Sequence, residues 1–141
     1  MASLSSDAAE STAAAVTVRT TATAAAASLI DIGANLLDPV FRGTYHGKQR
    51  HESDFDLVLE RARERGTSRI IVTAGTLEES REALALARAH DDLYCTVGVH
   101  PTRCNEFGYG DGGAEGLAKA KAHVAALLEV ARDGMRDGKV V

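Results

Sequence analysis

Residues 68–99, SRIIVTAGTLEESREALALARAHDDLYCTVGV, decide the fold of this chain. They begin with a run at 68–75 that is β-branched and apolar on both faces, which is typical of a strand covered on both sides. Thr76 and Glu79 then have the spacing of a helix-capping box, and residues 92–99 predict a second apolar strand. The helix between them should bury Leu77, Ala83, Leu84 and Ala87. A strand, a helix and a strand in this order predict a parallel sheet with a right-handed crossover.

The chain upstream of this unit repeats the same order. Residues 29–32 predict an apolar strand, and a loop at 38–53 separates this strand from a helix. Ser53, with Asp56 three positions later, predicts the cap at the start of this helix, and Gly66 predicts its end. The residues expected on its buried face are Phe55, Val58, Leu59 and Ala62.

The chain downstream predicts a third helix and the start of a further strand. A glycine-rich loop at 107–116 precedes the helix. The buried stripe of this helix should comprise Leu117, Val124, Leu128 and Ala131. Residues 138–141 predict the opening of a fourth strand. The alternation fits either a doubly wound sheet or a (β/α) barrel, and 141 residues are too few for a complete barrel of about 250 residues.

The first 28 residues differ in composition from the rest of the chain. They are almost all Ala, Ser, Thr and Val, so we expect a disordered tail at 1–28 and one folded domain at 29–141. Transit peptides are rich in Arg and poor in acids, whereas this tail has Arg19 beside Asp7 and Glu10. We therefore favour a cytoplasmic or nuclear protein over one that the tail directs to an organelle.

The overall charge limits the ligands that the chain can bind. A formal net charge of -4 and a pI near 5.7 exclude a broad cationic face, so any contact with nucleic acid must be local. No apolar run approaches the ~20 residues that span a bilayer, and we expect no membrane partner. Cys95 and Cys104 have neither a CxxC nor a zinc-finger spacing and are expected to be reduced thiols.

Polar residues gather where the three predicted strands end. In parallel α/β folds, ligands bind beyond the carboxyl ends of the strands. The residues that this rule selects are Asp31, Gly33, Asn35, Thr73, Gly75, Thr76, His100, Thr102 and Arg103. His100 precedes Pro101, and it either faces a pocket or caps the strand end through a backbone carbonyl. A metal role for His100 is disfavoured, because only Asp31 or Cys104 could join it as a ligand.

Two further features have both a structural and a functional interpretation. Asp31 ends an apolar strand, so its carboxylate is either part of a pocket or a buried acid satisfied by backbone N–H groups. The loop at 38–53 combines cations with rings. The residues concerned are Arg42, Tyr45, His46, Lys48, Arg50 and His51. Such a set suits a phosphodiester backbone with a ring on which a base can stack, although an ordinary solvated loop has the same composition.

Three segments carry a pattern that goes beyond the order of strands and helices. They are DIGANLLDPVFRGTYHGKQRHESDFDLVLERA at 31–62, IIVTAGTLEESREALALA at 70–87 and TVGVHPTRCNEF at 96–107. Together they resemble the TatD-type deoxyribonucleases, in particular the eukaryotic branch, from about Leu29 to Val141. The resemblance implies a TIM-like (β/α) barrel, of which about three and a half βα units are present. It also implies hydrolysis of DNA phosphodiesters, including 3′-to-5′ exonuclease action, with a divalent ion such as Mg²⁺ as cofactor and DNA as partner.

The same resemblance implies roles for individual residues. Many relatives open with D-x-H-x-H, and the two histidine positions are Gly33 and Asn35 here. The other family ligands, a glutamate in G-E-x-G-L-D and then two histidines and an aspartate, would lie beyond Val141. We therefore expect no metal ligand and no bound metal in this chain, and little activity from it alone. By analogy, His100 would line the substrate pocket with Asp31 and Asn35 at its floor. The residues expected to hold backbone phosphates are Arg42, Lys48 and Arg50.

Two other functions stay open on the sequence. The same scaffold could hydrolyse a small amide or ester, because a fold does not fix the substrate. Alternatively, the chain could be a non-catalytic fragment or interaction module, whose open sheet edge would favour association.

Overall fold

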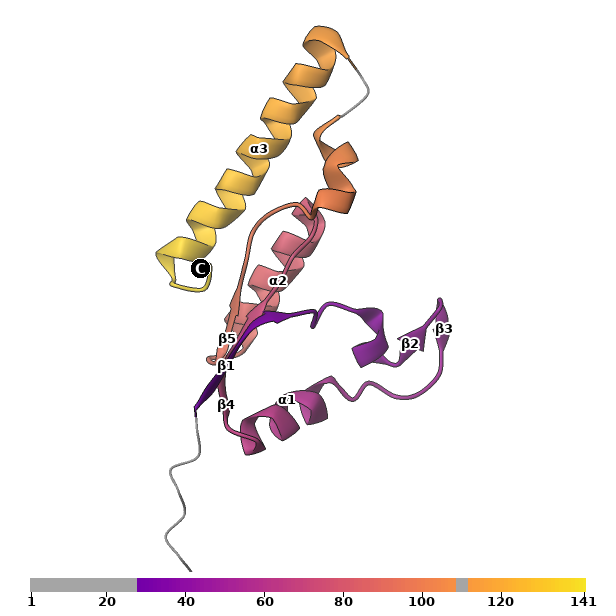
Figure 1. The fold of residues 1–141 in the computed structure, drawn as a ribbon, viewed down its shortest axis with the longest axis vertical. Helices are drawn as coiled ribbons and strands as arrows, with labels where there is room; N and C mark the ends of the chain where they lie inside the picture. The colour runs from indigo at the N-terminus through magenta and orange to yellow at the C-terminus, as the bar shows by residue number, and fades with distance from the viewer. Residues whose placement is uncertain (1–27, 109–111) are drawn as a thin grey trace, which may run out of the picture.

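The computed structural model describes residues 28–108 and 112–141, which form a parallel sheet with helices beside it (Figure 1). The predicted α/β class is therefore confirmed. The predicted disordered tail at 1–28 lies outside the described residues, except for Ser28. None of the helices in the described part of the chain combines the length and hydropathy that crossing a membrane requires.

The sheet contains parallel strands in the order in which they occur in the chain. β1 (Leu29–Ala34) pairs with β4 (Thr67–Val72), which in turn pairs with β5 (Leu93–Cys95). The predicted fourth strand is present as a single parallel bridge between Val140 and Cys95. Each strand therefore lies beside the next one, as in a barrel. The described part of the sheet has no reversal of strand order of the kind that defines a doubly wound sheet.

One helix follows each of these strands. α1 (Phe55–Glu64) connects β1 to β4, α2 (Leu77–Ala89) connects β4 to β5, and α3 (Gly113–Arg136) comes after β5 (Figure 1). α2 packs on β5, and α3 packs on α2. Gly134 lies at this helix contact, where a Cβ would be 2.7 Å from Leu84 Cδ1, so a larger residue here would displace the Leu84 side chain.

The core is built from the sheet, α1, α2 and the start of the loop after β1. Its buried residues are Leu36, Leu37, Leu59, Ile70, Val72, Ala83, Leu84, Ala87, Leu93 and Cys95. The predicted inner faces of α1 and α2 are therefore confirmed at Leu59, Ala83 and Leu84. Thr76 caps α2 as predicted, since its hydroxyl oxygen accepts from the Glu79 N–H (3.0 Å).

The predicted cap of α1 is wrong. The helix begins at Phe55, and Asp54 precedes it without a side-chain capping bond. Ser53, the predicted cap, instead donates its hydroxyl to the Phe41 carbonyl (3.2 Å). The serine therefore ties the start of α1 to the preceding loop, one residue before the capping position that Asp54 occupies.

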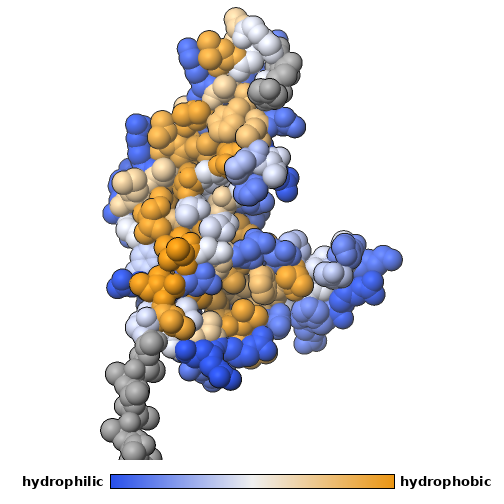
Figure 2. All heavy atoms as spheres, viewed as in Figure 1, coloured by the Kyte–Doolittle hydropathy of each residue, from blue (hydrophilic) through white to orange (hydrophobic). Residues whose placement is uncertain are grey.

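Three of the four residues in the predicted buried stripe of α3 are exposed. Leu117, Val124 and Leu128 are 56%, 45% and 45% exposed, and apolar side chains gather along this helix in Figure 2. α3 instead turns Val130 and the buried Gly134 toward the core. The spacing of these apolar residues identified an apolar face of the helix, but no described element of this chain packs against most of that face.

The loop between β1 and α1 contains short elements that the sequence did not predict. They are η1 (Pro39–Arg42) and a hairpin of β2 (Thr44–Tyr45) and β3 (Lys48–Gln49), which projects away from the sheet (Figure 1). His46 and Gly47 form the two-residue turn, with φ angles of 48° and 70°. Both angles are left-handed, as a type I′ hairpin turn requires, but His–Gly is not the usual Asn–Gly signal.

Candidate functional site

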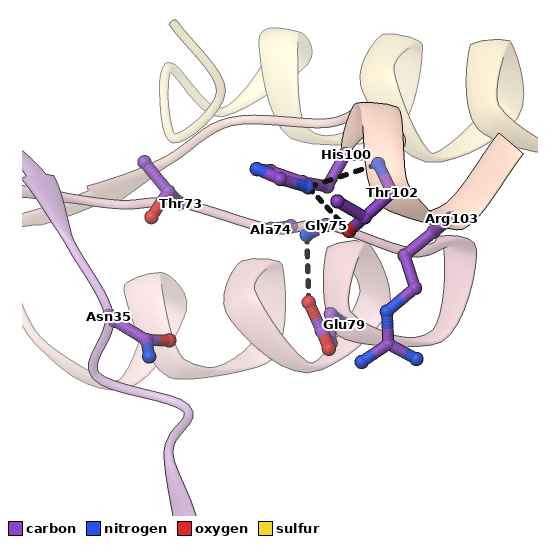
Figure 3. A pocket seen from close by; sticks show the side chains of 8 residues that line it. All are labelled: Asn35, Thr73, Ala74, Gly75, Glu79, His100, Thr102 and Arg103. Carbon is purple, nitrogen blue, oxygen red and sulfur yellow. Dashed lines mark hydrogen bonds between the residues drawn. The ribbon is translucent and has the colours of Figure 1, made fainter.

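A cavity of about 310 Å³ opens where β1, β4 and the chain after β5 end (Figure 3). Its lining residues are Asn35, Thr73, Ala74, Gly75, Glu79, His100, Thr102 and Arg103. Members of all three strand-end clusters selected from the sequence are among them. Because parallel strands present their carboxyl ends on one side of a sheet, three separate loops meet at this cavity.

A backbone contact between two of these loops places His100. Its N–H donates to the Gly75 carbonyl (2.9 Å), and the Gly75 N–H donates to the Glu79 carboxylate (2.7 Å). A Cβ at position 75 would lie 3.2 Å from the His100 Cβ and 3.1 Å from Glu79 Oε2. Both distances are shorter than ordinary van der Waals contacts, so a side chain at position 75 would push against both neighbours and strain the close approach of the two loops.

Ser80 fixes the segment that leads to His100. Its side chain is fully buried and donates to the Thr76 carbonyl (2.7 Å). The Gly98 N–H donates to the same hydroxyl oxygen (3.2 Å). The first turn of α2 is thus joined to the chain after β5, two residues before the histidine.

One imidazole nitrogen of His100 is hydrogen-bonded, and the other has no hydrogen-bond partner among residues 28–108 and 112–141. Nδ1 accepts from the Thr102 N–H (3.3 Å) and lies 2.8 Å from the Thr102 hydroxyl. A backbone N–H can only donate, so Nδ1 is the acceptor and the neutral ring carries its proton on Nε2. Figure 3 shows this second nitrogen on the side of the ring away from Thr102 and toward Thr73. His100 therefore caps η2 (Pro101–Phe107) and also lines the cavity, although it caps through an N–H and not through the predicted carbonyl.

Asp31 is not among the residues that line the cavity. Its side chain is exposed, and its Oδ1 accepts from the Gly33 N–H (3.0 Å). The β1–β4 register slips here, since Asp31 and Ala34 are three residues apart but pair with residues of β4 that are two apart. The carboxylate thus satisfies an N–H in an irregular stretch of the strand. Asp31 was expected either in the pocket beside Asn35 or as a buried acid, and the structure shows neither. Asn35 does line the cavity.

Arg42, Lys48 and Arg50 also lie outside the cavity lining. Arg42 ends η1, Lys48 begins β3, and Arg50 follows the hairpin. All three are exposed, and none forms an ion pair within the described part of the chain. The structure therefore separates the basic loop from the His100 cavity.

Glu79 is the acidic residue of the cavity lining, and the sequence did not select it. Its spacing from Thr76 marked it as part of a helix cap, but the pattern does not show that its carboxylate turns back to Gly75. No three His, Cys, Asp or Glu side chains within residues 28–108 and 112–141 are grouped closely enough to hold a metal ion. With Glu79 engaged by an N–H and His100 offering one nitrogen, the described lining does not fit a complete divalent-metal site.

The sequence and the fold both match known proteins. The family model described as "TatD related DNase" matches residues 30–141. The chain belongs to the TatD family. It is 40% identical over 112 residues to the deoxyribonuclease Tat-D of Schizosaccharomyces pombe, a match covering 79% of this chain and 34% of that relative. It is 41% identical over 81 residues to the 3′-5′ ssDNA/RNA exonuclease TatD of Erwinia tasmaniensis, covering 56% of this chain and 27% of that relative.

A solved TatD structure has the same fold over most of this chain. The hydrolase TatD family protein from Entamoeba histolytica matches with a TM-score of 0.66 at 38% identity. The match covers 82% of this chain and 36% of that one. The predicted partial barrel is therefore confirmed, and this TatD chain spans about a third of the length of the relatives that it matches.

Proposed function

We propose that this TatD chain supplies the phosphodiester-binding wall of a metal-dependent deoxyribonuclease that acts from the 3′ end of DNA. The observation that carries the proposal is the open Nε2 of His100, at a cavity formed by three strand-end loops. The names of the two relatives, a deoxyribonuclease and a single-strand exonuclease, support DNA as the substrate.

In this proposal, His100 donates its Nε2–H to a non-bridging oxygen of the scissile phosphate. Arg103, in the same wall, supplies a guanidinium, whose planar donors suit phosphate oxygens. The Asn35 amide adds a further donor. The Glu79 carboxylate is engaged by the Gly75 N–H (2.7 Å), which offsets part of its repulsion toward the phosphate.

A divalent ion such as Mg²⁺, implied by the resemblance, would activate the attacking water and neutralise charge on the phosphoryl group. The lining residues described above do not fit a complete site for such an ion. The residues of this chain therefore bind and orient the phosphate, and the proposal assigns them no part as a full set of metal ligands.

Arg42, Lys48 and Arg50 are proposed to contact phosphates away from the bond that is cleaved. Because none of them has an ion-pair partner among the described residues, contact with a phosphate breaks no existing bridge. Each phosphate contact on a single strand contributes about 0.7 to the slope of log affinity against log salt. Three contacts should therefore give a slope of about -2.

Replacement of His100 by alanine tests the proposal. We expect His100→Ala to weaken binding of a fluorescent oligothymidylate by about tenfold or more, the effect of losing a hydrogen bond to a charged group. His90→Ala is the matched control, because His90 caps the far end of α2 and should leave affinity unchanged. Equal affinities for wild type and His100→Ala, with both chains folded by circular dichroism, would contradict the proposal.

A further inference from the structure

The hairpin region carries a concentrated positive charge in an acidic chain. Residues 39–51 contain Arg42, Lys48 and Arg50 and no Asp or Glu, so their formal charge is +3 against -4 for the whole chain. Several arginines on the helices are paired with carboxylates by contrast, as in the 2.7 Å bond from Arg88 to an aspartate. Hydrophilic side chains cover the projecting end of the molecule in Figure 2. The charge of this region is therefore available to an anionic ligand.

Two rings stand at the turn of the hairpin. Tyr45 is 54% exposed, and its ring meets that of His46 edge-on, with centroids 4.2 Å apart and an interplanar angle of 67°. Gln49 braces the two strands, since it accepts from the Thr44 hydroxyl (3.1 Å) and donates to the Arg42 carbonyl (3.1 Å). The rings are thus held on an ordered turn.

A second cavity, of about 370 Å³, lies beside these rings. Its lining residues are Asp38, Pro39, Thr44, Tyr45, His46 and Gly47, and none of them lines the His100 cavity. The volume falls at the lower end of the range for small-molecule sites, about 300–1,000 Å³. Asp38 is the carboxylate of this lining, and it already accepts from the Val40 N–H (2.9 Å). The cavity is therefore a small site with a wall formed by two rings, and β3, which begins with Lys48, follows its last lining residue in the chain.

We propose that Tyr45 and His46 form a binding site for an unpaired nucleobase, with Lys48 and Arg50 on the neighbouring phosphates. The inference rests on the proposed function and adds to it a nucleobase site on the hairpin, separate from the His100 cavity. Proteins hold single strands by stacking bases on aromatic rings while cations neutralise the backbone. In a duplex both faces of a base are already stacked, so this site selects single strands.

Strands of equal charge, with and without bases, test this site. Fluorescence anisotropy at one salt concentration would give the affinity of the chain for an oligothymidylate, for an abasic strand of the same length and for a duplex. One stacked base contributes roughly fivefold to a hundredfold in affinity, and wild type should prefer the oligothymidylate over the abasic strand by that factor. Tyr45→Ala should remove the preference, and Tyr45→Phe, which keeps the ring, should retain it.

Lys48→Ala is the matched control. It should lower the affinities for the oligothymidylate and the abasic strand by the same factor and leave the ratio of the two affinities unchanged. Equal affinities of wild type for the two strands, or no binding of either, would overturn the nucleobase site without any variant. A preference that survives in folded Tyr45→Ala would overturn it as well. Failure of the His100 proposal can be told apart from these results, because His100→Ala would then bind the oligothymidylate with the same affinity as wild type.

Discussion

Replacement of Ser80 by alanine should destabilise the chain and loosen the loop that carries His100. The buried hydroxyl donates to the Thr76 carbonyl (2.7 Å) and accepts from the Gly98 N–H (3.2 Å). Alanine removes both bonds and leaves the Gly98 N–H without this acceptor. An unsatisfied donor in a buried site costs about 1–3 kcal/mol, and the higher helix propensity of alanine offsets about 0.5 kcal/mol of that cost.

The net loss should therefore be about 0.5–2.5 kcal/mol in the free energy of unfolding, measured by urea denaturation. For a domain of this size, each kcal/mol lowers the Tm by about 4–8 °C. Ser53→Ala is the matched control, because the exposed Ser53 hydroxyl also donates to a carbonyl but its loss should cost no more than about 0.5 kcal/mol. In ¹⁵N NMR spectra, the amide of Gly98 should shift in Ser80→Ala and stay in place in the control.

A Ser80→Ala chain that unfolds at the same urea concentration as wild type, with Gly98 unshifted, would refute this reasoning. The link between the first turn of α2 and the chain after β5 would then not hold the loop. The physical explanation for the position of His100 would have to rest on the Gly75 contact alone.

Two further predictions concern an ion pair and the thiols. Arg63 donates twice to the Asp92 carboxylate (2.7 and 2.8 Å), and this lowers the pKa of Asp92. The stabilisation is therefore complete above the ordinary carboxyl pKa of about 3.9 and is lost as pH falls through the lower folded value. Urea denaturation should show that Asp92→Asn lowers the free energy of unfolding by about 0.5–1 kcal/mol at neutral pH. The loss should vanish below the pKa values of Asp92 in the folded and unfolded chain. A loss that does not change with pH would count against the ion pair. Burial raises the pKa of the Cys95 thiol to about 11. Mass spectrometry should therefore find that the exposed Cys104 is alkylated before Cys95. Rapid labelling of Cys95 in the folded chain would show that the core is open.

The sequence predicted elements whose signals are local. The cap at Thr76 and the small buried face around Ala83 lie within a few residues of one another, and both are present in the structure. The prediction that Leu117 on α3 is buried failed, because its burial depends on another element packing against it. The prediction for the environment of Asp31 failed for a similar reason, since this environment depends on how β1 pairs with β4.

The sequence predicted those parts of the candidate site that follow from the order and direction of the strands. Parallel strands bring their ends together, so Asn35 and His100 line one cavity although they are far apart in the chain. Glu79 was not found, because the turn of its carboxylate toward Gly75 depends on how two loops meet. The nucleobase site depends on His46 adopting a left-handed backbone, which is uncommon for a residue other than glycine.

In the proposed function, the three strand-end loops bind one phosphodiester at His100. The most direct measurement is an NMR titration of the ¹⁵N-labelled chain with a thymidine dinucleotide, following the His100 ring nitrogens and the amides of Thr73 and Arg103. We predict that the His100 Nε2 signal and both amides shift together with one dissociation constant, and that the shifts are lost in His100→Ala. A titration that leaves these signals in place while residues elsewhere respond would contradict the claim.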